Sequence, residues 1–176
     1  MRSAEHQSDR ADTEPEEQEK RVETGTHVEL WLRGNSPTCV RDAQEEAYER
    51  LQRLQRAGRI GSVTSHVWEP IETTPRATDP EHTAVYRETI SEFRDWANER
   101  GYSLCPGFQT RDMTPMLADE SREEIVPPIL CLAVYVDDTL TTVFPHADGE
   151  CVHTVTDGLD RLEAETEDPF VGGAMA

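Results

Sequence analysis

Apolar and polar residues alternate where the predicted folded part of the chain begins. A period of two over residues 27–33 predicts a β-strand with one face in the core. The core face carries Val28, Leu30 and Leu32. The opposite face carries His27, Glu29, Trp31 and Arg33.

After a turn at residues 34–37, apolar residues recur at steps of three and four, which predicts an amphipathic helix ending near Gly58. Ser36 or Thr38 is available as its N-cap. The apolar face carries Val40, Ala43, Ala47, Leu51 and Leu54. A second strand follows over residues 60–68. The two strands are therefore expected to run parallel, joined by a right-handed crossover.

A polar loop at residues 70–80 separates this unit from a second predicted helix, which stops at Gly101. The apolar face of that helix carries Tyr86, Ile90, Phe93 and Ala97. Residues 102–108 suggest a third strand near a sheet edge, because a proline and a glycine interrupt it. Residues 110–126 show no period and are expected to be irregular.

Residues 129–136 are the most apolar run of the chain, which predicts a central strand covered on both faces. Asp137 and Asp138 make a tight turn into residues 139–144, which completes a hairpin. A short third helix closes the domain, and its apolar positions are Val152, Val155, Leu159 and Leu162.

This order of elements predicts an α+β fold. We expect a two-layer sandwich, loosely ferredoxin-like, with three helices on one face of a mixed sheet of about five strands. Residues 26–166 form this single domain, between a disordered acidic tail at residues 1–25 and a flexible C-terminal tail at residues 167–176. The expected core residues are Leu30, Leu51, Ile90, Phe93, Leu132 and Leu159.

The amino-acid composition indicates the salt environment in which the protein works. The chain has 36 acidic and 17 basic residues, a net charge of -19 at pH 7, and 35% hydrophobic residues. Its single lysine, Lys20, lies in the predicted tail. In multimolar salt the Debye length falls to roughly 3 Å or less, so carboxylates crowd a surface with little repulsion. The composition predicts a halophilic archaeal protein; an acidic mesophile protein from a GC-rich genome is the alternative.

No run of apolar residues suits a membrane span, and the N-terminus lacks the apolar run of a signal peptide. We therefore expect a soluble cytoplasmic protein without membrane contact. The four cysteines are widely spread without a CxxC pair, which favours buried thiols over disulfides. They are Cys39, Cys105, Cys131 and Cys151.

Arginines on the second half of the first helix are the candidate nucleic-acid contacts. They are Arg50, Arg53, Arg56 and Arg59. Acidic residues fill the first half of that helix, and Glu46 precedes Arg50 at the i,i+4 spacing that stabilises a helix. The acidic net charge also argues against binding nucleic acid through broad electrostatics. A helix-stabilising role is therefore the favoured interpretation.

Residues 146–153 hold the candidate metal ligands His146, Cys151 and His153. On a strand, Cys151 and His153 would face the same way, with His146 returning across the loop. This spacing matches no zinc signature, so the expectation is that no metal or other cofactor is bound. The same segment is the candidate centre of a metal-dependent or small-molecule enzyme, but no nucleophile elbow, P-loop or dinucleotide glycine pattern accompanies it. We therefore expect a non-enzyme.

Trp31 and Trp68 fall on the faces of their strands that point away from the predicted core. In a two-layer sandwich this face of the sheet is open, and aromatic residues there suggest a homodimer or a protein partner. A helix or loop of the same chain folded over that face is equally consistent with the pattern.

Four segments together resemble a haloarchaeal family of small acidic proteins described as helix-turn-helix domain proteins of unknown function. The segments are ValGluLeuTrpLeuArg (28–33), PheArgAspTrpAla (93–97), LeuCysLeuAlaValTyr (130–135) and AspGlyGluCysValHisThrVal (148–155). The resemblance extends over residues 27–163 and implies a role in transcription. Members of that family have Asp-Gly in the hairpin turn, where this chain has Asp137 and Asp138.

These observations predict a non-enzymatic binding or regulatory module that acts through protein contacts in transcription control. The alternative is a sequence-specific DNA-binding regulator, as the resemblance implies. An enzyme centred on residues 146–153 ranks third.

Overall fold

The fold was obtained as a computed structural model, and it describes residues 25–114, 116 and 121–164. Both predicted tails lie outside the described residues, apart from Gly25. The elements, in chain order, are β1 (Thr26–Arg33), α1 (Thr38–Arg56), β2 (Ser62–Trp68), β3 (Ile71–Glu72), α2 (Glu81–Arg100), β4 (Gln109–Met113), β5 (Arg122–Val126), β6 (Leu130–Val136), β7 (Thr139–Phe144), β8 (His146–Asp148), β9 (Cys151–His153) and α3 (Val155–Ala164).

The main sheet has four strands in the order β2-β1-β6-β7. Strand β1 runs parallel to β2, with Val28 opposite Val63, and antiparallel to β6, with Leu30 opposite Leu132. The predicted β1–α1–β2 unit is therefore confirmed, as is the β6–β7 hairpin. Asp137 and Asp138 both have positive φ, 48° and 61°, as the turn between β6 and β7 requires.

Helices α1 and α3 pack on one face of this sheet. Leu51 of α1 and Leu159 of α3 meet Leu30 and Leu132 of the sheet in a single buried cluster. Gly158 permits close packing here, because a Cβ at that position would lie 2.6 Å from a ring carbon of Phe144. This face matches the predicted core.

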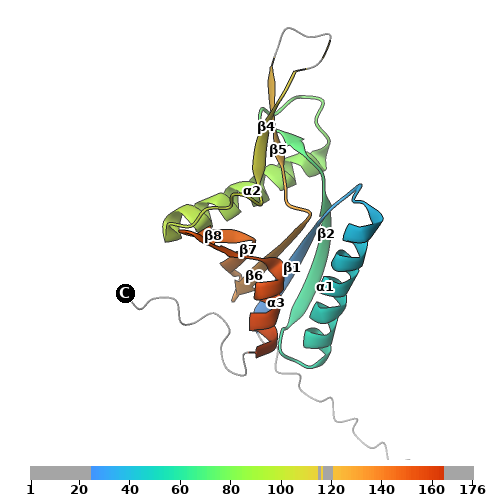
Figure 1. The fold of residues 1–176 in the computed structure, drawn as a ribbon, viewed down its shortest axis with the longest axis vertical. Coiled ribbons are helices and arrows are strands. Elements are labelled where there is room, and N and C mark those ends of the chain that lie inside the picture. The colour runs from blue at the N-terminus through green and yellow to red at the C-terminus, as the bar shows by residue number, and fades with distance from the viewer. Residues whose placement is uncertain (1–24, 115, 117–120, 165–176) are drawn as a thin grey trace, which may run out of the picture.

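Helix α2 packs on the opposite face, where Ile90, Phe93 and Trp96 join Trp31 and Cys131 in a second buried cluster. Figure 1 shows the sheet between α2 on one side and α1 with α3 on the other. The predicted two-layer arrangement with all helices on one face is therefore wrong, and the molecule has three layers. The physical reason is that β6 is apolar on both faces, so both faces needed covering.

The α+β class and the three helices are confirmed. All six residues expected in the core are buried: Leu30, Leu51, Ile90, Phe93, Leu132 and Leu159. The main sheet has four strands where about five were expected, because residues 102–108 are not a strand. Leu104 and Phe108 instead fill the core beneath α2 from a loop.

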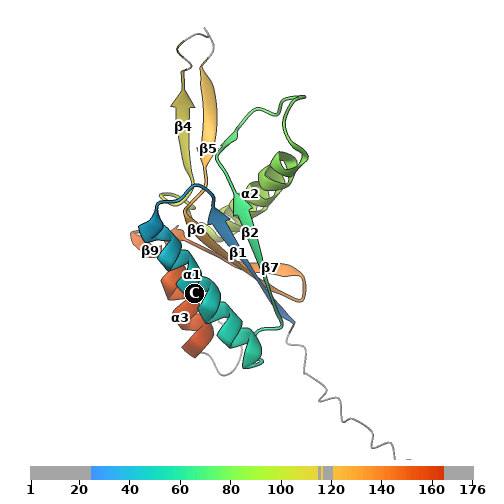
Figure 2. The same cartoon turned by 90° about the vertical axis from the view of Figure 1, so that its right-hand side faces the viewer.

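Two small sheets were not predicted. Strands β3, β5 and β4 form the first, and the β4–β5 hairpin extends away from the body of the molecule in both views (Figures 1 and 2). Apart from Gln109, it lies within residues 110–126, which were expected to be irregular. Strands β8 and β9 form the second, so Val152 belongs to a strand and not to the third helix.

Within the described residues, none of the helices combines the length and apolarity that crossing a membrane requires. The four cysteines are free thiols, as expected. Only Cys131 is buried, and burial raises the pKa of its thiol. The expectation of buried thiols is wrong for the exposed Cys39, Cys105 and Cys151.

Candidate functional site

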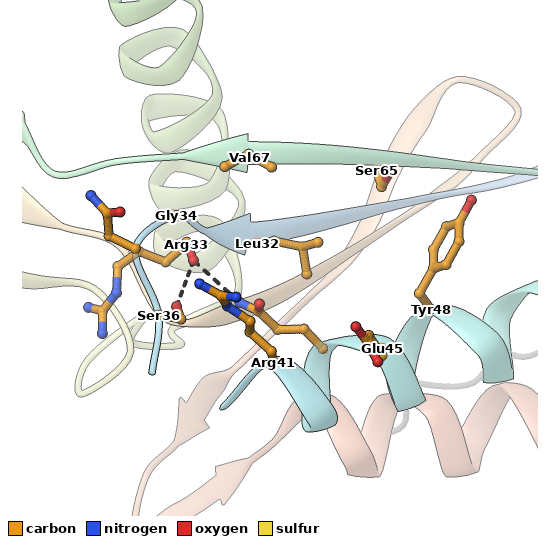
Figure 3. A pocket seen from close by; sticks show the side chains of 11 residues that line it. Leu32, Arg33, Gly34, Ser36, Arg41, Glu45, Tyr48, Ser65 and Val67 are labelled. Carbon is orange, nitrogen blue, oxygen red and sulfur yellow. Dashed lines mark hydrogen bonds between the residues drawn. The ribbon is translucent and has the colours of Figure 1, made fainter. Parts of the chain in front are cut away.

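A groove of about 350 Å³ runs between the first half of α1 and the outer strand β2 of the main sheet. Figure 3 shows Ser65 and Val67 on β2, Leu32 on β1, and Tyr48, Glu45 and Arg41 on α1. Its lining residues are Leu32, Arg33, Gly34, Asn35, Ser36, Arg41, Gln44, Glu45, Tyr48, Ser65 and Val67. We call this feature the edge groove.

The turn between β1 and α1 fixes the end of the edge groove. Asn35 adopts a positive φ of 54°, which asparagine tolerates better than most residues. Ser36 Oγ donates a hydrogen bond of 2.7 Å to the carbonyl of Arg33. Gln44 Nε2 donates one of 2.9 Å to the carbonyl of Ile129. These bonds hold the start of α1 over β1 and leave β2 beside the helix uncovered.

Apolar surface lies exposed along the edge groove. Val67 is 56% exposed and Tyr48 is 37% exposed. Arg41 and Glu45 are exposed on the α1 side and carry opposite charges. Arg33, at the end of β1, donates to the carbonyl of Pro127 at 3.2 Å. The groove therefore offers an apolar strip lined by two arginines and one glutamate, in a chain whose net charge is strongly negative.

Strand β2 is the last strand of the main sheet and pairs only with β1 among the described strands. The carbonyl of Trp68 faces β1, because it accepts a hydrogen bond from the amide of Gly34. Since backbone groups alternate in direction along a strand, those of Val63, Ser65 and Val67 face outward. The hydroxyl of Tyr86 donates to the carbonyl of Val67 at 2.7 Å, which agrees with this direction.

The four arginines predicted as nucleic-acid contacts differ in what they contact. Arg50 is held by α3: it donates to Glu163 at 2.8 Å and to Asp160 at 2.6 Å. The hydrogen bond from Arg50 lowers the pKa of the Glu163 carboxyl. Arg59 donates to the carbonyl of Glu163. The other two, Arg53 and Arg56, are exposed. The stripe is thus partly a helix-to-helix contact.

The predicted metal ligands are only partly brought together. His146 and His153 lie opposite each other on the β8–β9 hairpin, with ring centroids 4.8 Å apart. Cys151 lies opposite Asp148 at the far end of the hairpin and is exposed. Among residues 25–114, 116 and 121–164, no group of three or more His, Cys, Asp or Glu side chains is arranged to hold a metal ion.

His146 is buried, and its Nδ1 donates to the carbonyl of Val143 at 2.6 Å. Its ring stacks on Tyr102 at a centroid distance of 4.9 Å. Burial lowers the pKa of His146, and the neighbouring His153 and Arg161 act in the same direction. The contacts of this imidazole are therefore those of a packed core residue.

Trp31 and Trp68 are 3% and 0% exposed, so the predicted interface through them is corrected. Helix α2 and the loop that follows it cover this face, as the alternative interpretation of the pattern allowed. The two rings pack against each other at 4.9 Å, and the ring of Phe108 meets Trp68 edge-on at 5.5 Å.

A cluster of titratable side chains on the α2 face was not predicted. Glu29 accepts a hydrogen bond of 3.0 Å from Trp31 Nε1, and its other oxygen lies 3.6 Å from His27 Nε2 and 3.9 Å from His66 Nε2. Nearby, burial raises the pKa of Tyr135. The alternation in β1 placed His27, Glu29 and Trp31 on one face, but the register that brings His66 opposite Trp31 is a tertiary feature.

Comparison with known proteins adds one match. The sequence model of a family described as a helix-turn-helix domain matches residues 20–167. Neither curated proteins nor solved structures give a match.

Proposed function

We propose, from the premise that the chain belongs to the helix-turn-helix domain family, that it is a non-enzymatic regulatory module in transcription control. It acts by binding another protein chain along the outer edge of β2. The observation that carries this proposal is the open, uncharged edge of that strand beside the edge groove.

The sequence of β2, SerValThrSerHisValTrp, contains no Asp, Glu, Lys or Arg. Outer strands usually carry charges that prevent pairing with other chains. Strand β4 follows this rule with Arg111 and Asp112, whereas β2 does not. Outward-facing backbone groups and an adjoining apolar groove are the features that an added strand uses for affinity and specificity. They support a protein partner.

DNA binding is the second candidate, and membership of the family favours it. Docking by a helix-turn-helix places the second of two consecutive helices in the major groove. Here β2 and β3 separate α1 from α2, and strands β4 to β9 separate α2 from α3. Arg50 is bound to carboxylates of α3. Within the predicted stripe, contact with phosphate would therefore depend mainly on Arg53 and Arg56, which favours the protein-binding proposal.

The two candidates are distinguished by purifying the tagged chain, two single-site variants and one double variant from a lysate in about 2 M KCl. Val67→Lys alters the edge groove. Val152→Lys is the matched control, because Val152 is 49% exposed on β9, which belongs to a separate two-stranded sheet. We expect a defined partner chain to be retained by the wild type and Val152→Lys and lost from Val67→Lys. Co-purification of nucleic acid that Val67→Lys keeps and Arg53→Gln with Arg56→Gln loses would contradict the proposal and support DNA binding.

A further inference from the structure

We infer that the strand which pairs with β2 is β2 of a second copy of this chain, antiparallel and centred on Ser65. The inference rests on the proposed function, because it names the partner at the same edge. The two-fold axis would pass between the two Ser65 residues and extend the main sheet through both copies.

The backbone of β2 fits this pairing. In an antiparallel pair centred on Ser65, each Ser65 faces its copy, and Val63 faces Val67 of the other copy. These residues are the ones whose amide and carbonyl groups face outward, so the facing residues can exchange hydrogen bonds. The carbonyl of Val67 already accepts from Tyr86, but a carbonyl oxygen has a second lone pair.

The side chains fit as well. Val63 and Val67 lie on the α1 side of the sheet, where Val63 packs against the core cluster that includes Leu51. The pairing sets each exposed Val67 against a Val63 and covers the apolar strip that continues to Tyr48. On the other side of the sheet, Thr64 faces His66 of the second copy. No like charges face each other along the strand pair. An isologous contact requires this, because the same surface patch of both copies meets.

Charge explains why a second copy is suited to this edge. Each chain has a net charge of -19, so two copies repel each other over most of their surfaces. Helix α1, for example, presents Asp42, Glu45, Glu46 and Glu49. The seven residues of β2 form a strip without carboxylates along which two acidic chains can approach closely.

The opposite edge of the main sheet does not offer the same opportunity. Trp96 Nε1 donates to the carbonyl of Thr141 on β7 at 2.9 Å. Leu140, Thr142 and Val143 of that strand are buried. The outer edge of β4 carries charged residues, as noted above. Within the described strands of the main sheet, β2 is therefore the open edge.

Light scattering and sedimentation in about 2 M KCl test the inference at protein concentrations up to about 100 µM. The wild type and Val152→Lys should have about twice the chain mass of 19.9 kDa. Val67→Lys should have the mass of one chain while keeping the circular dichroism spectrum of the wild type. A monomeric wild type, or a Val67→Lys variant that stays dimeric, would overturn the inference.

A cross-link gives a readout that does not depend on a disruptive variant. Facing residues in a hydrogen-bonded antiparallel pair have Cα atoms about 5.5 Å apart, within the range of a disulfide. With the exposed Cys39, Cys105 and Cys151 replaced by serine, Ser65→Cys should form a covalent dimer on mild oxidation. Thr64→Cys should not, because Thr64 does not face its own copy. Equal cross-linking of the two variants would overturn the register.

The outcomes also separate this inference from the proposed function. Suppose that the wild type is a monomer that retains a different chain, and that Val67→Lys does not retain that chain. The second copy is then the wrong partner, and the proposed function stands. Suppose instead that the wild type dimerises by pairing of β2, and that this dimer binds nucleic acid by Arg53 and Arg56. The inference then stands, and the proposed function fails.

Discussion

His146 shows how one buried side chain links the fold to pH. It is 4% exposed, packs against the rings of Tyr102 and His153, and donates its Nδ1 proton to the carbonyl of Val143. A proton on Nε2 would place a positive charge in this buried site, beside Arg161. Burial therefore lowers the pKa of His146 and favours the neutral ring in the folded chain.

We predict that this histidine makes the folded chain less stable in mild acid. Because the unfolded chain takes up the proton first, the free energy of unfolding should be unaffected above the unfolded pKa, about 6.5. It should fall as the pH drops below that value towards the lower folded pKa. Urea unfolding at fixed KCl between about pH 7.5 and 5 measures this slope.

His146→Gln should reduce the slope, since the amide can still donate to Val143 but does not titrate in this range. His82→Gln is the control, because His82 is exposed at the start of α2. Equal slopes in His146→Gln and the wild type would show that another group causes the acid sensitivity.

The arginines of α1 differ in what they contact, and stability measurements should separate them. Only 13% of the Arg50 side chain is exposed, and its removal leaves Glu163 and Asp160 of α3 without their partner. Allowing for the exposure of those carboxylates, Arg50→Gln should lower the free energy of unfolding by about 1 kcal/mol. Arg53→Gln, at an exposed position, should change it by less than about 0.5 kcal/mol. The reverse order in urea unfolding would contradict the α1–α3 contact.

Elements with a strong hydrophobic period were predictable from the sequence, and polar ones were not. An apolar face is buried in strand β1, helices α1 and α2, and the β6–β7 hairpin. The spacing of apolar residues along these elements therefore indicates their structure. All five residues of β4 are exposed, and the β4–β5 hairpin therefore leaves no apolar alternation to read. Residues 102–108 were misassigned because apolar loop residues, such as Leu104 and Phe108, fill the core without forming a strand.

The edge groove escaped sequence analysis for a different reason. The sequence predicted β2 but could not say that it is the outer strand, which depends on the order of strands in the sheet. The positions of Trp31 and Trp68 opposite the predicted core suggested an open face there instead. Helix α2 occupies that face, and the open surface lies instead along the backbone edge of β2.

Helix α3 begins with a reciprocal cap that can be tested as a single element. The amide of Thr154 donates to Asp157 at 2.7 Å, and the amide of Asp157 donates to the Thr154 hydroxyl at 3.2 Å. This is a capping box with Asp in place of Glu. Thr154→Ala should therefore lower the free energy of unfolding by about 1 kcal/mol.

Thr156→Ala is the matched control, since Thr156 is exposed one position inside the helix. Thermal unfolding followed by circular dichroism compares the two variants. If both variants unfold at the wild-type midpoint, the cap contributes nothing to stability.

For the whole molecule, the charge of -19 predicts that salt stabilises the fold. At about 0.1 M KCl the Debye length is about 10 Å, so neighbouring carboxylates repel, whereas at about 3 M it falls below about 3 Å. Added salt screens this repulsion and strengthens the two apolar clusters on either side of the sheet. Circular dichroism should show structure and thermal midpoint increasing over this range. A flat response would mean that surface repulsion does not limit stability.

The central claim is that the outward backbone of β2 receives another strand. Amide hydrogen exchange, read residue by residue at about 2 M KCl and at two protein concentrations, tests it most directly. The amides of Val63, Ser65 and Val67 should exchange slowly at high concentration and faster on dilution, while those of Thr64 and His66, which face β1, stay protected throughout. Rapid exchange of the three outward amides at every concentration would contradict the account.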